Sequence, residues 1–400
     1  MAASSEIVRP PAPPGPIHWL KKNLFSTWYN ALLTVAALAF LFFALRGILG
    51  WILFQANWEP VSHSLKLFAV GHYPPESMWR VGVILLMMAF LLGVSWRVWR
   101  GTVGTLAMAQ AVALGLVALL PIGLDLLPLP ARLWLLGNPA LTLAGFLLGR
   151  FVRRPLWVLL GWIAAFALMI LLLGGISGIP WLTPVASGLW GGLLLTFLLA
   201  AVGIVASFPI GVLLALGRRS ALPVVKVFCT AFIELVRGVP LVTILFMFSL
   251  VLPLFLPEQV RIDRVLRAML AMTFFASAYM AENVRGGLQA IPRGQVEAAR
   301  ALGLSGFQVT LLIVLPQALR MVIPAIVGQF IALFMDTTLA NIIGLSELLT
   351  IGREVLQSKR EWLLLDMEVF IFIAALFWVF TYSMSYASRR LERALGVGRR

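Results

Sequence analysis

The sequence of 400 residues has few cysteines, histidines and charged residues, and each shortage excludes a class of protein. The single cysteine, Cys229, has no partner for a disulfide framework. Charged residues make up 12% of the chain, about half of the roughly 25% that is usual in soluble domains, so an ordinary soluble fold is excluded. The histidines form no helical i,i+4 pair and have no cysteine beside them, which excludes the usual zinc motifs; they are His18, His63 and His72.

The chain also lacks the motifs of an ATPase or of a membrane enzyme. None of its five lysines follows a glycine, so a Gly-x-x-x-x-Gly-Lys-Ser/Thr phosphate-binding loop is absent. No clustered His/Asp, Ser/His or Cys/His set is apparent either. We therefore expect no catalytic residue, no metal site and no cofactor bound by this chain.

Long apolar runs are the dominant feature, and 61% of the residues are hydrophobic. Ten runs are candidate helical spans, because lipid offers backbone groups no partner outside their own helix. They cover residues 31–54, 81–96, 102–120, 133–149, 156–176, 189–216, 227–250, 266–284, 317–340 and 367–387. The fourth is interrupted by Gly137, Asn138 and Pro139, which predicts a re-entrant segment or one helix of a kinked pair. The fold class is an all-α integral membrane protein, a multi-span helical bundle with eight to ten spans.

The formal charge of +15 has two competing explanations. A basic face would bind nucleic acid, whereas basic loops on one side of a membrane would orient the spans. With the N-terminus placed inside, the inner segments carry 20 Lys and Arg residues and the outer loops carry 9; Arg46 and Arg237 fall within spans. This ratio predicts that both termini are cytoplasmic and that no nucleic acid is bound.

The two halves of the chain differ in character. After a Pro-rich cytoplasmic N-terminus at residues 1–30, an accessory region at 31–176 contains four or five spans with few polar residues. The loop 174–188, which contains Gly, Ser and Pro, is taken as the boundary. The later spans carry ionisable side chains, each costing at least about 2.5 to 3.5 kcal/mol in a bilayer, so these groups should face one another or a wet cavity.

Glu234 and Arg237 lie three residues apart on one helix face, and in a straight span starting near Lys226 they would be close to the midplane. They either neutralise each other or line a substrate pathway, since a zwitterionic amino acid offers one carboxylate and one ammonium group. Pro240 would kink this helix and free a carbonyl group nearby.

Two further polar groups occupy later spans. Glu282 and Arg285 repeat the three-residue spacing, which predicts a structural or gate pair. The other group either lines the pathway or forms hydrogen bonds between helices; it consists of Asp336, Thr337, Thr338 and Asn341.

The inner loop 285–316 contains a short predicted helix. Pro292 can begin it, residues 297–301 are strong helix formers, and Gly303 can close it in a left-handed cap. Small residues at Ala298 and Ala299 would form a knob that presses into a groove on another protein. Spacing alone favours an ordinary interfacial loop helix.

The same loop resembles the EAA loop of type I ABC importer permeases at every defining position. Glu297-Ala-Ala is followed after three residues by Gly303 and after nine more by Ile313-Val-Leu-Pro316. Three further blocks resemble polar amino acid permeases of that family, in the same order. They are ELVRGVPL from Glu234, AYMAENVRGG from Ala278 and DTTLANIIG from Asp336, with Val239 where threonine is usual. The resemblance covers residues 187–392, and the preceding spans resemble those of long M-type permeases of general L-amino acid importers.

The resemblance implies a C-terminal five-helix type I ABC permease core, with coupling loop 285–316, in the bacterial inner membrane. It implies two ATP-binding cassette ATPase subunits that hold ATP and Mg, a second permease subunit in a heterodimer, an amino acid substrate, and a periplasmic amino-acid-binding protein. The outer loops 251–267 and 341–366 are candidates for docking that protein. The short helix would be the coupling helix, and its residues that engage the ATPase would be Glu297, Ala298, Ala299, Gly303 and Pro316.

Glu297, near the start of this short helix, would interact with the positive end of the helix dipole and meet a basic group of the ATPase, or would simply cap the helix. An ion-gradient-driven secondary transporter is the competing hypothesis, because ten spans and midplane charges would suit it equally well. A secondary transporter has no ATPase for a coupling loop to engage, so the EAA loop favours the importer.

Overall fold

The computed structural model describes residues 15–119, 129–257 and 259–396, and within these ranges its secondary structure is helical, without a β-strand. This confirms the predicted all-α class. Most of the predicted Pro-rich stretch lies outside the described residues. Contacts divide the chain into a unit of residues 1–58 and a unit of residues 59–400.

The first unit contains α1 (Pro16–Asn23) and α2 (Trp28–Phe54). The side chain of Thr27 caps α2 by accepting a hydrogen bond from the backbone nitrogen of Asn30 at 3.4 Å. At 27 residues, α2 is long and apolar enough to cross a membrane.

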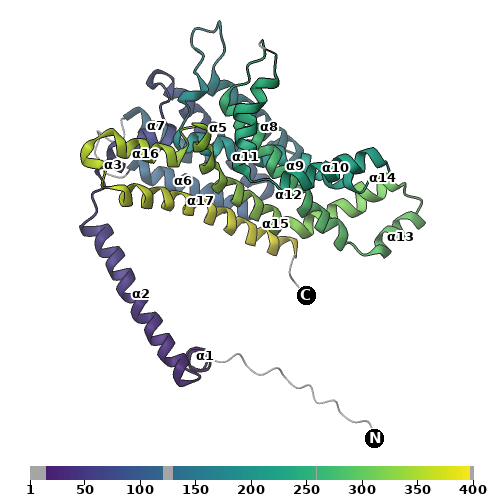
Figure 1. Cartoon of the computed structure of the whole chain (residues 1–400), viewed down its shortest axis with the longest axis horizontal. Coiled ribbons are helices and arrows are strands. Elements are labelled where there is room, and N and C mark those ends of the chain that lie inside the picture. Colours follow the sequence, from purple (N-terminus) through teal and green to yellow (C-terminus); the bar gives the residue numbers. More distant parts are fainter. Residues whose placement is uncertain (1–14, 120–128, 258, 397–400) are drawn as a thin grey trace. The chain divides into compact units, whose positions relative to one another are not determined.

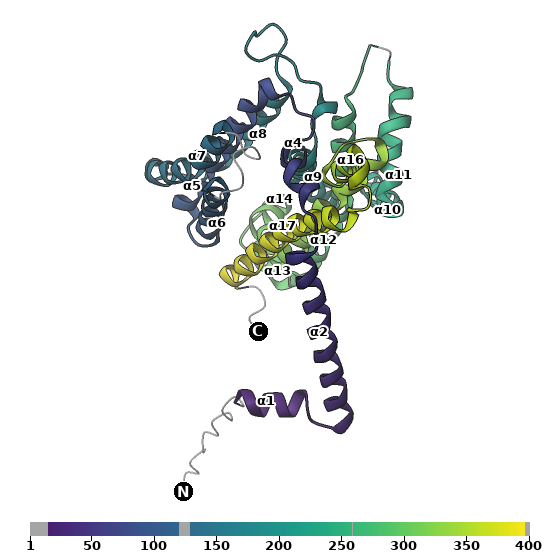
Figure 2. The same ribbon diagram turned by 90° about the vertical axis from the view of Figure 1, so that its left-hand side faces the viewer.

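The second unit contains two groups of long helices joined by short ones (Figures 1 and 2). One group consists of α5 (Met78–Trp99), α6 (Thr102–Leu119), α7 (Leu129–Leu148) and α8 (Pro155–Gly174). The other consists of α9 (Gly192–Arg218), α10 (Pro223–Arg237), α11 (Leu241–Phe246), α12 (Arg264–Ala290), α15 (Leu315–Asp336) and α17 (Asp366–Leu395). The short helices are α3 (Glu59–His63), α4 (Leu65–Val70), α13 (Arg293–Ala301), α14 (Gly306–Gln308) and α16 (Leu348–Ser358).

Within the described residues, each of the ten predicted spans coincides with helix, although 227–250 is divided between two helices and not every helix qualifies as a membrane span alone. Among the described residues, eight helices are long and apolar enough to cross a membrane, and a ninth span would be the pair Pro223–Arg237 and Leu241–Phe255, bent by 107°. α12 is a continuous helix of 27 residues, but its terminal charges lower its hydropathy and it is not one of the eight.

The interruption predicted at Gly137 to Pro139 is absent, because α7 continues through it with Pro139 inside the helix. The amide of Gln110 donates to the buried side chain of Asn138 at 2.7 Å, and the hydroxyl of Thr142 donates to the backbone oxygen of Asn138 at 3.0 Å. α7 is thus one continuous helix through Pro139, so the re-entrant prediction was wrong.

Two hydrophobic cores hold the second unit together. The larger joins the two groups of long helices; Val81 of α5, Leu173 of α8, Leu198 of α9 and Leu333 of α15 belong to it. The smaller lies at the end of α9, α12 and α15 where α13 and α14 are found (Figure 1) and includes Ala299 of α13. The second core therefore connects the loop between α12 and α15 to the long helices.

Candidate functional site

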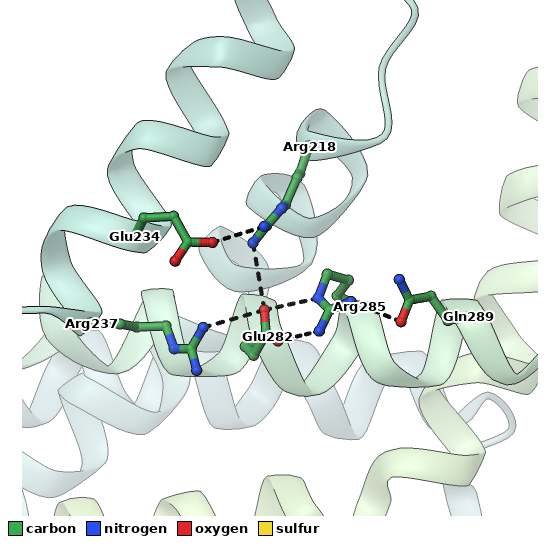
Figure 3. Close-up of polar contacts among 6 residues, drawn as sticks. All are labelled: Arg218, Glu234, Arg237, Glu282, Arg285 and Gln289. Atoms are coloured by element: carbon green, nitrogen blue, oxygen red, sulfur yellow. Dashed lines mark hydrogen bonds and ion pairs between the residues drawn. The ribbon is translucent and has the colours of Figure 1, made fainter.

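Five charged side chains and a glutamine from α9, α10 and α12 form a cluster, named here the charge cluster (Figure 3). α9 contributes its last residue, α10 contributes its last turn, and α12 contributes three residues along one stretch. The members are Arg218, Glu234, Arg237, Glu282, Arg285 and Gln289.

Glu282 is at the centre of the charge cluster. Arg285 donates to both of its carboxylate oxygens, with Nε 2.9 Å from Oε2. Nη1 of Arg237 and Nη1 of Arg218 approach the same Oε2 at 3.5 and 3.6 Å. Arg218 also donates through Nη2 to Glu234 at 2.8 Å. Three guanidinium groups therefore share two carboxylates, and the cluster has a positive surplus.

This surplus leaves hydrogen-bonding capacity unused. Within the described residues, Nη1 of Arg218 and Nε of Arg237 are buried and have no hydrogen-bond acceptor. The ring of Tyr279 lies 5.7 Å from the guanidinium carbon of Arg237. The side chains of the three arginines and of Glu282 are 23–34% exposed, and that of Glu234 is 56% exposed. The guanidinium groups therefore remain accessible and have donors left for a carboxylate-bearing ligand.

The chain breaks directly after Arg237. Gly238 ends α10, Pro240 has φ −60° and ψ 145°, and α11 leaves at an angle of 107° to α10. Proline supplies no backbone donor and restricts the residue before it to extended conformations, which explains the stop. The prediction of a kink at Pro240 therefore understated the turn. The midplane estimate for Glu234 and Arg237 assumed a straight span, and this bend removes its basis.

The predicted mutual pairing of Glu234 and Arg237 was wrong. Glu234 pairs with Arg218, while Arg237 pairs with Glu282 on α12. The predicted pairing of Glu282 with Arg285 is present. Arg218 was the residue that sequence reasoning missed, because it was counted only as a loop charge. Arg218 ends α9 five residues before α10 begins, and this short connection indicated that its side chain could reach α10.

The loop between α12 and α15 has the predicted helix. Pro292 precedes α13 and Gly303 follows it with φ +81°, a left-handed conformation that favours glycine. The nitrogens of Gly303 and Leu304 donate back to Arg300 and Ala299 at 2.9 and 3.3 Å. Ser305 and Gln308 then form a capping box that starts α14.

Two of the roles assigned to α13 need correction. Glu297 is the fifth of nine residues, beyond the first turn, so neither a contact with the helix dipole nor capping explains it. Ala299 is 4% exposed and packs into the second core, whereas Ala298 is exposed, so the two do not form one outward knob. Large apolar side chains next to α13 are exposed instead, namely Leu302 at 82% and Phe307 at 75%.

Pro316 lies in the first turn of α15, directly after a π-helical segment at Val309–Val314. A proline removes one backbone donor from the helical ladder, and the wider π turn accommodates that loss. The chain therefore changes its helical winding locally at Pro316 as it enters α15.

In the second predicted polar group, the two threonines form hydrogen bonds with backbone oxygens of the preceding helical turn. The hydroxyl groups of Thr337 and Thr338 donate to the oxygens of Phe334 and Met335 at 2.7 and 2.9 Å, so hydrogen bonds between helices were the wrong expectation for these two. Asp336 ends α15 and is half-buried. The 3₁₀ segment Thr337–Ile343, which includes Asn341, contacts α11, beyond the break that follows the charge cluster.

Comparison with known proteins gives a consistent picture. Residues 207–397 match the family described as binding-protein-dependent transport system inner membrane component. The chain is 36% identical over 398 residues to the inner membrane amino-acid ABC transporter permease protein YhdY of Escherichia coli, covering 95% of this chain and 93% of that protein. It is 36% identical over 426 residues to the glutamate/glutamine/aspartate/asparagine transport system permease protein BztC of Rhodobacter capsulatus, covering 95% and 94%. The probable glutamine ABC transporter permease protein GlnP of Bacillus subtilis is 36% identical over 204 residues, covering 51% of this chain and 92% of that protein.

Proposed function

Because the chain belongs to the family of binding-protein-dependent transport system inner membrane components, we propose that it moves amino acids by alternating access, driven by an ATPase seated on α13. It is a non-enzymatic permease subunit of an amino-acid ABC transporter, and ATP hydrolysis belongs to a separate chain. The predicted resemblance to long permeases is confirmed, and the secondary-transporter hypothesis is set aside.

The observation that supports the coupling step is the exposed loop around α13. Leu302 and Phe307 present apolar side chains to solvent, while Ala299 is buried in the second core. An ATPase that binds this surface would pull on α12, because only two residues separate α12 from α13. Glu297, Ala298, Gly303 and Pro316 would shape or contact this surface.

The charge cluster is the proposed gate of the pathway. In this conformation Glu282 draws the three guanidinium groups together. The α-carboxylate of a substrate would compete with Glu282 for Arg237 and Arg218, and its ammonium group would pair with Glu234. Asp336 and Asn341, beyond the break after α10, are candidates for a second contact along the pathway.

The wider assembly follows the expectations from sequence. We propose that residues 187–392 form the permease core, that the spans within 31–176 are accessory, and that both termini are cytoplasmic. Family membership implies ATPase and binding-protein partners. We further propose two ATPase subunits holding ATP and Mg, a second, different permease subunit, and a periplasmic binding protein docked at loops 251–267 and 341–366.

Reconstitution tests this function. The full complex, with its ATPase and second permease, would be placed in proteoliposomes together with the binding protein and a set of labelled amino acids. Uptake should require ATP on the ATPase side and should persist when ion gradients are collapsed. Uptake driven by an ion gradient without ATP would contradict the proposal, and so would ATP hydrolysis by this chain alone.

A further inference from the structure

A surface hollow of about 380 Å³ lies at one end of α5, α7 and α8, in the group of helices that the transport mechanism does not use. It lies where α5 and η2 (Gly149–Phe151) end and α8 begins. Four arginines are exposed around it, namely Arg97, Arg100, Arg150 and Arg153. Among the residues that the structure describes, no carboxylate lines this hollow.

Close backbone packing forces these arginines together. A Cβ atom on Gly93 would lie 2.0 Å from the backbone oxygen of Thr142, and one on Gly145 would lie 2.0 Å from that of Phe90. Only glycine allows α5 and α7 to cross this closely, as in the small-xxx-small contacts of membrane helices. Arg97, one turn after Gly93, and Arg150, beside Gly149, therefore meet at the same end of the crossing.

The charges of these arginines are not compensated by acidic partners. In the described part of the chain, none of the four takes part in an ion pair. Arg97 and Arg150 lie 5.3 and 4.7 Å from the ring centroids of Phe146 and Phe151 instead. Pro155 begins α8 at the hollow, so the positive end of a 20-residue helix adds to the field. Four like charges around one hollow, without an acidic partner among the described residues, favour an anionic ligand.

The surroundings of the hollow indicate where that anion comes from. Trp99 and Trp157, one and two residues in sequence from residues that line it, are 45% and 64% exposed, and tryptophan gathers at membrane interfaces. Farther along α8 the exposed side chains are apolar, including Leu156 at 58% and Leu159 at 51%. Basic pockets between membrane helices bind anionic lipid headgroups.

We propose that this hollow binds the phosphate group of an anionic phospholipid whose acyl chains lie along α8. A free phosphate would use the arginines but not the apolar face beside them. An acidic segment of a partner protein would use the charges but would leave the exposed leucines of α8 without a role.

Lipid retention in the full complex tests the proposal. The complex would be reconstituted in nanodiscs of phosphatidylcholine containing a minority of phosphatidylglycerol, and the lipids that remain bound would be counted by native mass spectrometry. The test variant carries Arg150→Gln and Arg153→Gln. The matched control carries Arg219→Gln and Lys226→Gln, which removes two exposed basic residues from another loop predicted on the same side.

Wild type and control should retain phosphatidylglycerol over phosphatidylcholine, and the test variant should lose at least about tenfold of this preference. A variant with Arg150→Lys and Arg153→Lys should keep most of it, which separates charge from misfolding. Equal retention of the two lipids by wild type, or an equal loss in the control, would overturn the proposal. Displacement of phosphatidylglycerol by inorganic phosphate at matched concentration would indicate a site for free anions. A preference for phosphatidylglycerol seen only without the partner chains would indicate a surface for a protein partner. Either result overturns the proposal.

Discussion

Replacing Gly303 is the sharpest test of the coupling loop. The residue has φ +81°, and a Cβ atom built on it meets no heavy atom within 4 Å. A side chain at this position would therefore not collide with its own protein. The whole effect must come from the left-handed backbone that closes α13 and sets the direction of the chain toward α14.

The size of the effect expected from replacing Gly303 follows from its backbone conformation. A left-handed conformation costs an L-residue about 1–2 kcal/mol, and each 1.4 kcal/mol is about a tenfold change in population. Gly303→Ala should thus reduce the population of the native cap by about tenfold, and the β-branched variant Gly303→Val by more. Gly303→Asn should retain more function, because asparagine tolerates this conformation. Gly294→Ala is the matched control, since its Cβ also meets open space but its φ is not positive.

The assay is ATP-dependent uptake by the reconstituted complex, with membrane level and ATPase binding measured in parallel. Gly303→Val should reach the membrane at the wild-type level but should lose uptake and bind the ATPase more weakly. Gly294→Ala should transport normally, because alanine improves helix stability inside α13. Normal uptake by Gly303→Val would refute the assignment of this loop as the coupling element, and an equal loss in Gly294→Ala would refute the argument from the left-handed backbone.

Two other predictions concern charged residues. The first uses double-mutant cycles, which measure the interaction energy of two residues from the thermal unfolding of the complex. The interaction energy of Arg237→Gln with Glu282→Gln should be about 0.5 kcal/mol or more, and that of Arg237→Gln with Glu234→Gln should be smaller. Equal interaction energies would contradict the observed partners. Burial raises the pKa of Glu347, outside the spanning helices, although hydrogen bonds from Leu349 and Thr350 oppose the shift. The folded state then holds its proton to higher pH than the unfolded state, so this group destabilises the fold as pH rises above the ordinary value of about 4.5. The melting temperature of Glu347→Gln minus that of wild type should therefore become more positive between mildly acidic and neutral pH, and a difference that stays constant or becomes more negative would refute this.

The positions of the long helices could be predicted from sequence, because the bilayer imposes one rule on every span. Apolar run length alone placed helix correctly in each of the ten runs, although the run 227–250 is divided into two helices. The same rule could not predict that Gln110 of α6 would bind Asn138 of α7, because this contact joins two different helices. Periodicity within one segment carries no information about partners in a different segment.

The charge cluster shows the same limit more strongly. Three-residue spacing made Glu234 and Arg237 look like a pair, yet both bind residues on other helices. Pro240 predicted a break in the helix but not the angle of 107° between the two helices. A proline fixes only its own φ angle, and the packing of the neighbouring helices sets the direction of the chain. The role of Glu297 failed although Pro292 marked the start of α13 correctly, because the fifth residue of the helix already lies beyond the first turn.

The geometry of α12 links the two parts of the proposed mechanism. Eight residues separate Glu282 from the end of α12 at Ala290, a distance of about 12 Å along a rigid helix. A displacement of α13 would therefore reach Glu282 almost undiminished. The contacts of Glu282 with Arg237 and Arg218, at 3.5 and 3.6 Å, are longer than a good hydrogen bond, whereas Arg285 moves with Glu282 on the same helix. A shift of about an ångström is thus enough to tighten or release α9 and α10 while the pair on α12 stays intact, which is the behaviour that a gate driven from the coupling loop requires.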